Sequence, residues 1–224
     1  MKRAFDPMMQ ARLEAAGVVA VLVIDRAADG PPLARALLAG GVDGMELTLR
    51  TPAALDALRA IRAEVPAMLA GIGTILTPEQ VGEVVEAGGA FGVSPGTNPR
   101  VLEAAVAAGL SFAPGITVPS DVERALEFGC RLLKFFPAEA SGGLAYLKAM
   151  AAPYAHLGVK YMPLGGLTEK NMASYLADAS IAALGGSWLA PRDLIQKQDW
   201  AAITARAAAA RAIVTATRAA ASKT

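Results

Sequence analysis

The chain has 224 residues, of which 54% are hydrophobic and 18% are charged, and its formal net charge is +1. This length and apolar content suffice for one large hydrophobic core. The near-neutral charge excludes the strongly basic or acidic classes, so we expect no nucleic acid, acidic partner or membrane surface.

The chain contains one cysteine, Cys130. An intrachain disulfide and a cysteine-based metal cluster are therefore excluded. Its position between a glycine and an apolar strand indicates a small buried residue and not a nucleophile. Residues 1–7 contain an aspartate and a proline at the place where a signal peptide has an uninterrupted apolar segment. The apolar run 15–24 is too short to span a bilayer. We therefore expect a cytoplasmic protein.

The first predicted elements are a helix, a buried strand and a second helix. Residues 6–16 have helical spacing, and we expect this helix to close one end of the core. Residues 18–24 form a continuous β-branched run, typical of a parallel strand that is buried on both faces. Pro31 and Pro32 begin the next helix, which ends at Gly40. A strand over residues 44–49 follows.

The same pattern then recurs along the chain: a helix ends at a glycine, and a short strand follows. Strands end near residues 24, 48, 71, 93, 113, 134, 162 and 184. Helices then start at a capping residue or a proline, in the segments 77–80, 98–99, 119–121 and 168–169. Roughly eight βα units, each of about 20 to 30 residues, predict a (β/α)8 barrel.

An open doubly wound sheet is the alternative fold. It requires a glycine-rich turn after the first strand, which residues 25–30 do not provide. We therefore expect a single barrel domain over residues 1–224, with an N-terminal helix and an alanine-rich C-terminal helix over residues 201–221. That last helix carries Arg206, Arg211 and Arg218, which we expect on a solvated face.

Lys134 lies within an apolar run, residues 131–137, that is closed by Pro137. A buried ammonium is costly unless it is paired or neutral, and burial favours the neutral, nucleophilic amine. Such an amine can attack a ketone and form a Schiff base, which makes the carbonyl carbon an electron sink. Taken alone, such a lysine more often extends past the strand end into water. The surrounding pattern favours the catalytic interpretation.

Glu46 is the second charged candidate, because it stands in an otherwise apolar strand. In a (β/α)8 barrel the active site lies at the C-terminal ends of the strands. Glu46 and Lys134 belong to the second and sixth predicted strands, so their side chains can meet across the barrel. The pair could perform acid–base chemistry or could be a buried structural ion pair.

Three further residues follow predicted strands. Arg50, beyond the second strand, suits a substrate carboxylate but could be a rim charge. Thr74 is a hydroxyl at the end of the third strand, where a turn cap is the plainer interpretation. Pro95 shapes the end of the fourth strand and is expected to have no chemical role of its own.

Two glycine pairs predict a phosphate site. Barrels often bind phosphate between the loops after strands seven and eight, through backbone amides that only glycine lets approach closely. Gly165 and Gly166 occupy the first of these loops, and Gly185, Gly186 and Ser187 occupy the second. One such pair is an ordinary turn, but two pairs at both expected positions indicate a phosphorylated substrate.

A metal site is weakly supported. His156 is the only histidine, and it follows a proline near a helix end, where a surface or capping role is expected. No carboxylate cluster suggests an obligatory Mg²⁺. Covalent catalysis by a lysine removes the need for one, so we expect no cofactor.

The motifs also carry a family resemblance, which extends over residues 18–199. The segments 46–51 (ELTLRT), 73–74 (GT), 94–96 (SPG), 134–139 (KFFPAE) and 185–188 (GGSW) resemble 2-keto-3-deoxy-6-phosphogluconate (KDPG) aldolase and the related 4-hydroxy-2-oxoglutarate (KHG) aldolase. The resemblance implies a class I aldolase on a barrel, a homotrimer, a phosphorylated 2-keto acid substrate and a place in the Entner–Doudoroff pathway.

The resemblance also implies a role for each matching residue. Lys134 would form the Schiff base, and Glu46 would be the general acid and base. Substrate binding is implied for Arg50 and Thr74 at the pyruvyl carboxylate, for Pro95 and Phe136 lining that end, and for Gly165, Gly166, Gly186 and Ser187 at the phosphate. The departure is Leu164, where family members acting on the gluconate substrate usually have threonine. Leu164 therefore puts the stereochemical preference at C4 in question.

The expected reaction is the reversible cleavage of KDPG to pyruvate and glyceraldehyde 3-phosphate. Alternatives within the family are cleavage of KHG or of the galactonate epimer of KDPG. A phosphosugar isomerase or synthase would have similar phosphate loops without needing an imine. A non-catalytic barrel that binds a phosphorylated ligand is the remaining alternative. Trapping with pyruvate and borohydride distinguishes these possibilities, because only the aldolase forms a reducible imine with pyruvate.

Overall fold

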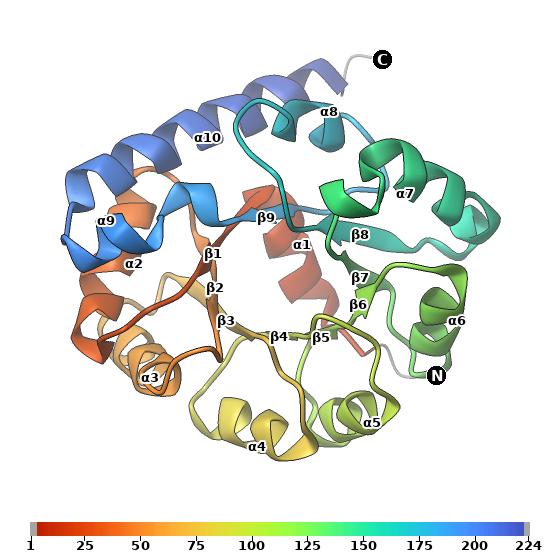
Figure 1. The fold of residues 1–224 in the computed structure, drawn as a ribbon, viewed down its shortest axis with the longest axis horizontal. Coiled ribbons are helices and arrows are strands. Elements are labelled where there is room, and N and C mark those ends of the chain that lie inside the picture. Colours follow the sequence, from red (N-terminus) through yellow and green to blue (C-terminus); the bar gives the residue numbers. More distant parts are fainter. Residues whose placement is uncertain (1–3, 222–224) are drawn as a thin grey trace.

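The computed structural model describes residues 4–221 and contains a closed barrel of parallel strands (Figure 1). One sheet has the order β5-β4-β3-β2-β1-β9 and the other the order β6-β7-β8. Bridges from Tyr161 to Ile181 and from Leu164 to Gly185 join β8 to the β9 side. The strands are β1 (Val18–Leu22), β2 (Gly44–Thr48), β3 (Leu69–Gly73), β4 (Gly92–Val93), β5 (Phe112–Ala113), β6 (Gly115–Ile116), β7 (Leu132–Phe135), β8 (Lys160–Pro163) and β9 (Leu184–Gly186).

The fifth barrel strand is divided in two by Pro114. This residue separates β5, which pairs with β4, from β6, which pairs with β7. Proline has no N–H to donate to a ladder, although the carbonyl of Pro114 still accepts from the amide of Lys134 at 2.8 Å. The strand was predicted to end near residue 113, and it continues to Ile116 instead. With this division counted, the eight strands confirm the predicted (β/α)8 barrel.

Helices surround the barrel in the alternation that the sequence predicts (Figure 1). They are α1 (Pro7–Ala16), α2 (Gly30–Ala39), α3 (Ala54–Glu64), α4 (Pro78–Glu86), α5 (Pro99–Ala108), α6 (Pro119–Glu127), α7 (Gly143–Ala151), α8 (Met172–Leu176), α9 (Arg192–Gln196) and α10 (Trp200–Ala221). Thr77 and Gln80 form the capping box that begins α4. The helix predicted from Thr168 begins only at Met172, because the side chain of Asn171 accepts the Thr168 amide and holds a turn there.

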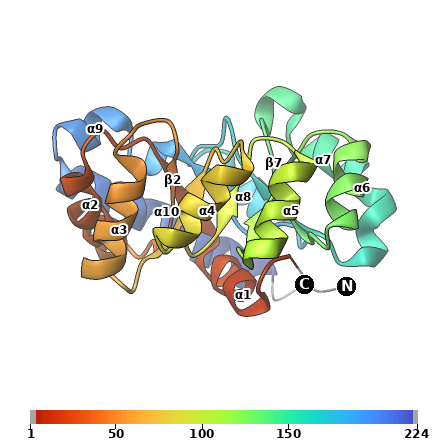
Figure 2. The ribbon, with the colours of Figure 1, turned by 90° about the horizontal axis from the view of Figure 1, so that it is seen from below.

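Helix α1 covers the N-terminal ends of the strands, as expected (Figures 1 and 2). Asp6 caps the helix by accepting from the amide of Met9 at 2.9 Å. Leu13 and the preceding Phe5 are buried in the same apolar cluster as the inward side chains of the barrel, which include Leu69 and Leu132. The barrel interior is therefore filled at this end and open to a ligand only from the other.

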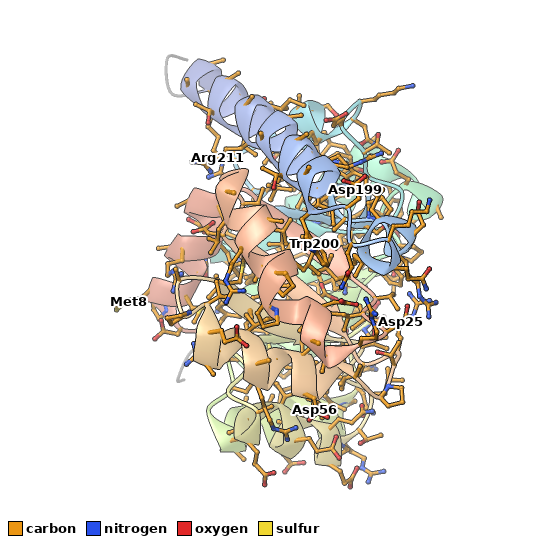
Figure 3. All side chains as sticks on the ribbon, turned by 90° about the vertical axis from the view of Figure 1, so that its left-hand side faces the viewer. Met8, Asp25, Asp56, Asp199, Trp200 and Arg211 are labelled. Carbon is orange, nitrogen blue, oxygen red and sulfur yellow. The ribbon has the colours of Figure 1, made fainter. Side chains whose placement is uncertain are left out.

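Of the three arginines of α10, Arg206 is exposed as expected, whereas Arg211 and Arg218 are half-buried and do not belong to a solvated face. Arg211 donates to the carbonyls of Ala15 and Ala16 at the end of α1, and Arg218 donates to the carbonyls of Glu14 and Ala182. In Figure 3, Arg211 lies on the side of the barrel where Met8 marks α1. A helix leaves its last carbonyls without partners, so these arginines complete the end of α1 and fasten α10 across it.

Two smaller predictions concern buried and apolar segments. Cys130 is fully buried, and desolvation raises the pKa of its thiol to about 12, which confirms an inert apolar residue. Among residues 4–221, no helix has both the length and the apolar character needed to cross a bilayer.

Candidate active site

A cavity of about 610 Å³ opens at the C-terminal ends of the strands. It is lined by every residue that the sequence singled out for a catalytic, substrate-binding or specificity role. These residues are Glu46, Arg50, Thr74, Pro95, Lys134, Phe136, Leu164, Gly165, Gly166, Gly186 and Ser187. Residues at or just after the ends of six strands, β2, β3, β4, β7, β8 and β9, therefore share one concave surface, although they span about 140 residues of sequence.

Lys134 and Glu46 form an ion pair at the base of this cavity. The Nζ atom of Lys134 lies 3.1 Å from Oε1 of Glu46, and the two residues are 5% and 1% exposed. The same Nζ atom lies 5.5 Å from the centroid of the Phe136 ring. Oε2 of Glu46 is buried, and no donor among the described residues reaches it. A desolvated pair is a poor source of stability, so its retention indicates a chemical purpose.

Gly73 creates the space for this carboxylate, and the sequence argument did not assign it that role. Gly73 pairs with Thr48 on the neighbouring strand. A Cβ atom at Gly73 would lie 1.7 Å from Oε1 of Glu46 and 2.8 Å from its Cγ. Real Cβ contacts are essentially never below 3.0 Å, so only glycine lets the glutamate lie flat against β3.

Arg50 and Thr74 lie on the same part of the cavity wall, at the ends of β2 and β3. Thr74 has φ = +63°, a left-handed conformation that costs a residue with a side chain about 1 kcal/mol or more. The guanidinium of Arg50 is exposed and makes no hydrogen bond or ion pair with any other described residue. A planar cation without a protein partner, in the same cavity as a buried lysine, is suited to a ligand carboxylate.

The loops after β8 and β9 form the opposite wall. Gly165 and Gly166 have φ values of +96° and +82°, which favour glycine strongly. Gly186 is required by Trp188, because a Cβ atom there would lie 1.5 Å from the indole ring. Ser187 follows as an exposed hydroxyl at the start of the short 3-10 helix η4 (Ser187–Leu189). Both loops thus bring backbone close to the cavity, as the phosphate prediction requires.

The segment after Lys134 holds the first of these loops in place. The amide of Ala138 donates to the carbonyl of Leu164 at 2.7 Å, and the amide of Glu139 donates to the carbonyl of Gly165 at 3.0 Å. The carboxylate of Glu139 accepts from the hydroxyl of Tyr175. Burial, and then the carboxylate of Glu139, raise the pKa of Tyr175 above its ordinary range. Sequence reasoning missed the role of Tyr175, whose only signal was an aromatic in a short amphipathic helix.

Leu164 is 3% exposed and contributes apolar surface to the cavity. It forms a β-bridge with Gly185, whose missing side chain leaves room for it: a Cβ atom there would lie 2.7 Å from Cγ of Leu164. This side chain provides no hydrogen-bond donor or acceptor at the position where a threonine would provide both.

Arg192 and Trp188 also line the cavity and were not predicted. Arg192 is the first residue of α9 and forms an ion pair with Asp25, which follows β1. By contrast, His156 is exposed on the 3-10 helix η3 (Ala152–Leu157), as expected. Over the part of the chain that the structure describes, no group of three or more histidine, cysteine, aspartate or glutamate side chains could hold a metal ion.

Comparison with known proteins gives a consistent result. The family model described as KDPG and KHG aldolase matches residues 9–206. The 2-dehydro-3-deoxy-phosphogluconate aldolase of Treponema pallidum (strain Nichols) is 45% identical over 193 residues, which make up 86% of this chain and 91% of that protein.

Two solved structures have the same fold. The KDPG aldolase of Legionella pneumophila, with pyruvate captured as a covalent carbinolamine intermediate, superposes with a TM-score of 0.85 at 39% identity, over 90% of this chain and 97% of that one. The KDPG aldolase of Zymomonas mobilis ZM4, with 3-phosphoglycerate, gives a TM-score of 0.83 at 40% identity, over 90% and 94% of the two chains.

Proposed function

The chain belongs to the KDPG and KHG aldolase family, and we propose that Lys134 and Glu46 perform its chemistry. The reaction is the reversible class I cleavage of KDPG to pyruvate and glyceraldehyde 3-phosphate. The observation that carries this assignment is the buried contact of 3.1 Å between Lys134 and Glu46, at the base of a cavity large enough for a phosphorylated six-carbon acid.

The proposed sequence begins with attack of the Lys134 amine on the C2 ketone, and loss of water then gives an iminium ion. Glu46 removes the proton of the C4 hydroxyl group. The C3–C4 bond breaks, its electrons move into the iminium to form an enamine, and glyceraldehyde 3-phosphate is released. Glu46 returns the proton to C3, and hydrolysis of the new iminium frees pyruvate and Lys134. The same carboxyl group thus accepts and donates one proton per turnover.

The substrate lies, in this proposal, with its two anionic ends on opposite walls. Arg50 and Thr74 bind the carboxylate of the pyruvyl half, and Pro95 and Phe136 line that end. The phosphate contacts Gly165, Gly166, Gly186 and Ser187. Support for this orientation comes from the free guanidinium of Arg50 on one wall and the positive φ values of the glycine loop on the other.

KHG is a second candidate substrate, because it shares the pyruvyl half that Lys134 would activate and differs at the distal end. The family model covers both activities. Leu164, in place of a hydroxyl residue, favours looser selection at C4, where the two epimers of the phosphorylated substrate differ.

The function is tested by reducing the protein with borohydride in the presence of pyruvate and mapping the modified peptide. We expect a single adduct, on Lys134, and we expect Lys134→Ala to abolish both trapping and cleavage. Lys160→Ala is the matched control, because Lys160 lies on the adjacent strand β8 and its amine donates a hydrogen bond to the carbonyl of Ala179 at 2.6 Å. An adduct on Lys160, or cleavage that survives Lys134→Ala, contradicts the assignment.

We also propose that the protein is a homotrimer. Four of the five exposed large apolar side chains among the described residues, Leu76, Val85, Val106 and Val118, lie on or next to α4, α5 and α6. These helices are adjacent on the barrel surface (Figure 1), so the side chains provide an apolar region for a neighbouring subunit. Sedimentation equilibrium is expected to give three chain masses, and the mass of a single chain would contradict the proposal.

A further inference from the structure

Arg192 lies at the mouth of the cavity, beyond the two glycine loops. It begins α9, a few residues after Ser187, and it lines the cavity together with Ser187 and Thr168. Its side chain is 55% exposed. The residue is thus part of the wall that carries the proposed phosphate site, although no sequence motif pointed to it.

The guanidinium of Arg192 is held in a fixed orientation by Asp25. Its Nε atom lies 3.0 Å and its Nη2 atom 2.5 Å from the two carboxylate oxygens, and Gln196 donates to the same carboxylate at 2.8 Å. The hydrogen bonds from Arg192 and then from Gln196 lower the pKa of Asp25 to about 2, so the carboxylate is ionised at neutral pH. A bidentate contact of this kind fixes the plane of the fork.

Asp25 occupies only one edge of the arginine fork. A guanidinium has five N–H donors, and two are used here, so three remain. Arg192 lines the cavity, whereas Asp25 and Gln196 do not. Figure 3 places Asp25 on the opposite side of the barrel from Met8 of α1, that is, at the open end. The carboxylate therefore anchors the arginine from outside the cavity wall.

The charge distribution within the cavity gives this arginine a role. The lining contains three cationic side chains, those of Arg50, Lys134 and Arg192. The first two are assigned to the carboxylate and to the imine. A phosphate carries a charge of about −1.5 to −2 near pH 7. Its other proposed partners, glycine amides and a serine hydroxyl, are neutral, so Arg192 is the cation on its side.

We propose that Arg192 is a specificity-determining residue that binds the substrate phosphate and selects phosphorylated over unphosphorylated 2-keto acids. This inference rests on the proposed function and adds a residue to it. Because the fork is already oriented by Asp25, little side-chain entropy is lost when the phosphate binds. Asp25 and Gln196 are then positioning residues, which act through Arg192.

The test compares Arg192→Ala with Arg26→Ala. Arg26 lies in the same rim region, pairs bidentately with Asp29 at 2.9 Å and is 58% exposed, but it does not line the cavity. The readout is the ratio of kcat/KM for KDPG to kcat/KM for 2-keto-3-deoxygluconate, which lacks only the phosphate. We expect Arg192→Ala to lower this ratio about tenfold, the value of one charged hydrogen bond at a partly exposed site. Arg26→Ala should leave it within twofold.

Two further measurements separate this inference from the function on which it rests. Inhibition by inorganic phosphate should weaken in Arg192→Ala by a similar factor, and Arg192→Lys should recover part of the loss because it keeps the charge without the fork. Pyruvate trapping with borohydride should be unchanged in both variants. An unchanged selectivity ratio, or equal losses for both substrates, overturns the role of Arg192. Failure of the native protein to trap pyruvate overturns the proposed function instead.

Discussion

The replacement Gly73→Ala tests the acid–base role proposed for Glu46 without altering a single charged group. A methyl at this position would lie 1.7 Å from Oε1 of Glu46, where contacts under 3.0 Å are essentially never seen. The carboxylate must therefore retreat by more than about 1 Å. Glu46 is 1% exposed and lines the cavity, so a carboxylate displaced from β3 moves toward the cavity and away from its present position.

Two magnitudes follow from this displacement. Overpacking a well-filled interior costs about 1–3 kcal/mol of unfolding free energy, so the variant should remain folded. The contact between Lys134 and Glu46 is already 3.1 Å long, and a shift of this size takes it beyond hydrogen-bond reach. A misplacement of about 1 Å in a catalytic group costs roughly 100-fold in rate. We therefore expect kcat for KDPG cleavage to fall about 100-fold.

The assay couples pyruvate release to lactate dehydrogenase and records the thermal melting of the same samples. Gly82→Ala is the matched control, because Gly82 lies in α4 with no atom within 4 Å of an added Cβ. It should keep full activity and gain up to about 1 kcal/mol in stability, since alanine is the better helix former. If folded Gly73→Ala keeps kcat within threefold of the native value, Glu46 is not the acid–base group at the position described.

Two other predictions use Leu164 and Cys130. Leu164→Thr should raise the ratio of kcat/KM for the gluconate over the galactonate epimer by up to about tenfold, because it restores one hydrogen bond of about 0.5–1.5 kcal/mol; an unchanged ratio in competition assays rules out a stereochemical role. The pKa of Cys130 is raised in the folded state to about 12, so stability is lost as pH rises above the unfolded value near 8.5. Urea titrations should therefore show the native protein losing about 2 kcal/mol more than Cys130→Ala between pH 8 and pH 10, and equal losses would contradict the burial argument.

The sequence predicted those parts of the fold that depend on local chemistry. Glycine after each helix and proline or a capping residue before the next one are short-range signals, and the barrel follows from their repetition. Thr77, for example, caps α4 as its spacing to Gln80 predicts. Pro114 misled the same reasoning, because proline usually ends a strand and here it only interrupts one.

The meeting of the candidate site residues in one cavity was predictable because the barrel fold fixes where strand ends meet. Glu46 and Lys134 are 88 residues apart, yet the topology alone brings them across the barrel. What could not be predicted depends on long-range geometry within that frame. The need for glycine at position 73 comes from a side chain on the neighbouring strand, and the place of Arg192 depends on an aspartate 167 residues away. Arg211 and Arg218 of α10 were misassigned because their partners are backbone carbonyls, which no residue type in the sequence identifies.

Because α1 closes the N-terminal end of the barrel, substrates and products must enter and leave the cavity in a defined order. With the N-terminal ends of the strands filled by Phe5 and Leu13, ligands enter and leave at the end where the glycine loops and Arg192 lie. In the proposed orientation, the three-carbon aldehyde phosphate occupies this outer position after bond cleavage, and the pyruvyl fragment stays bound to Lys134 beneath it. The aldehyde must therefore depart first and pyruvate second. In the direction of synthesis the order reverses, and an aldehyde phosphate that binds before pyruvate obstructs the path to the lysine.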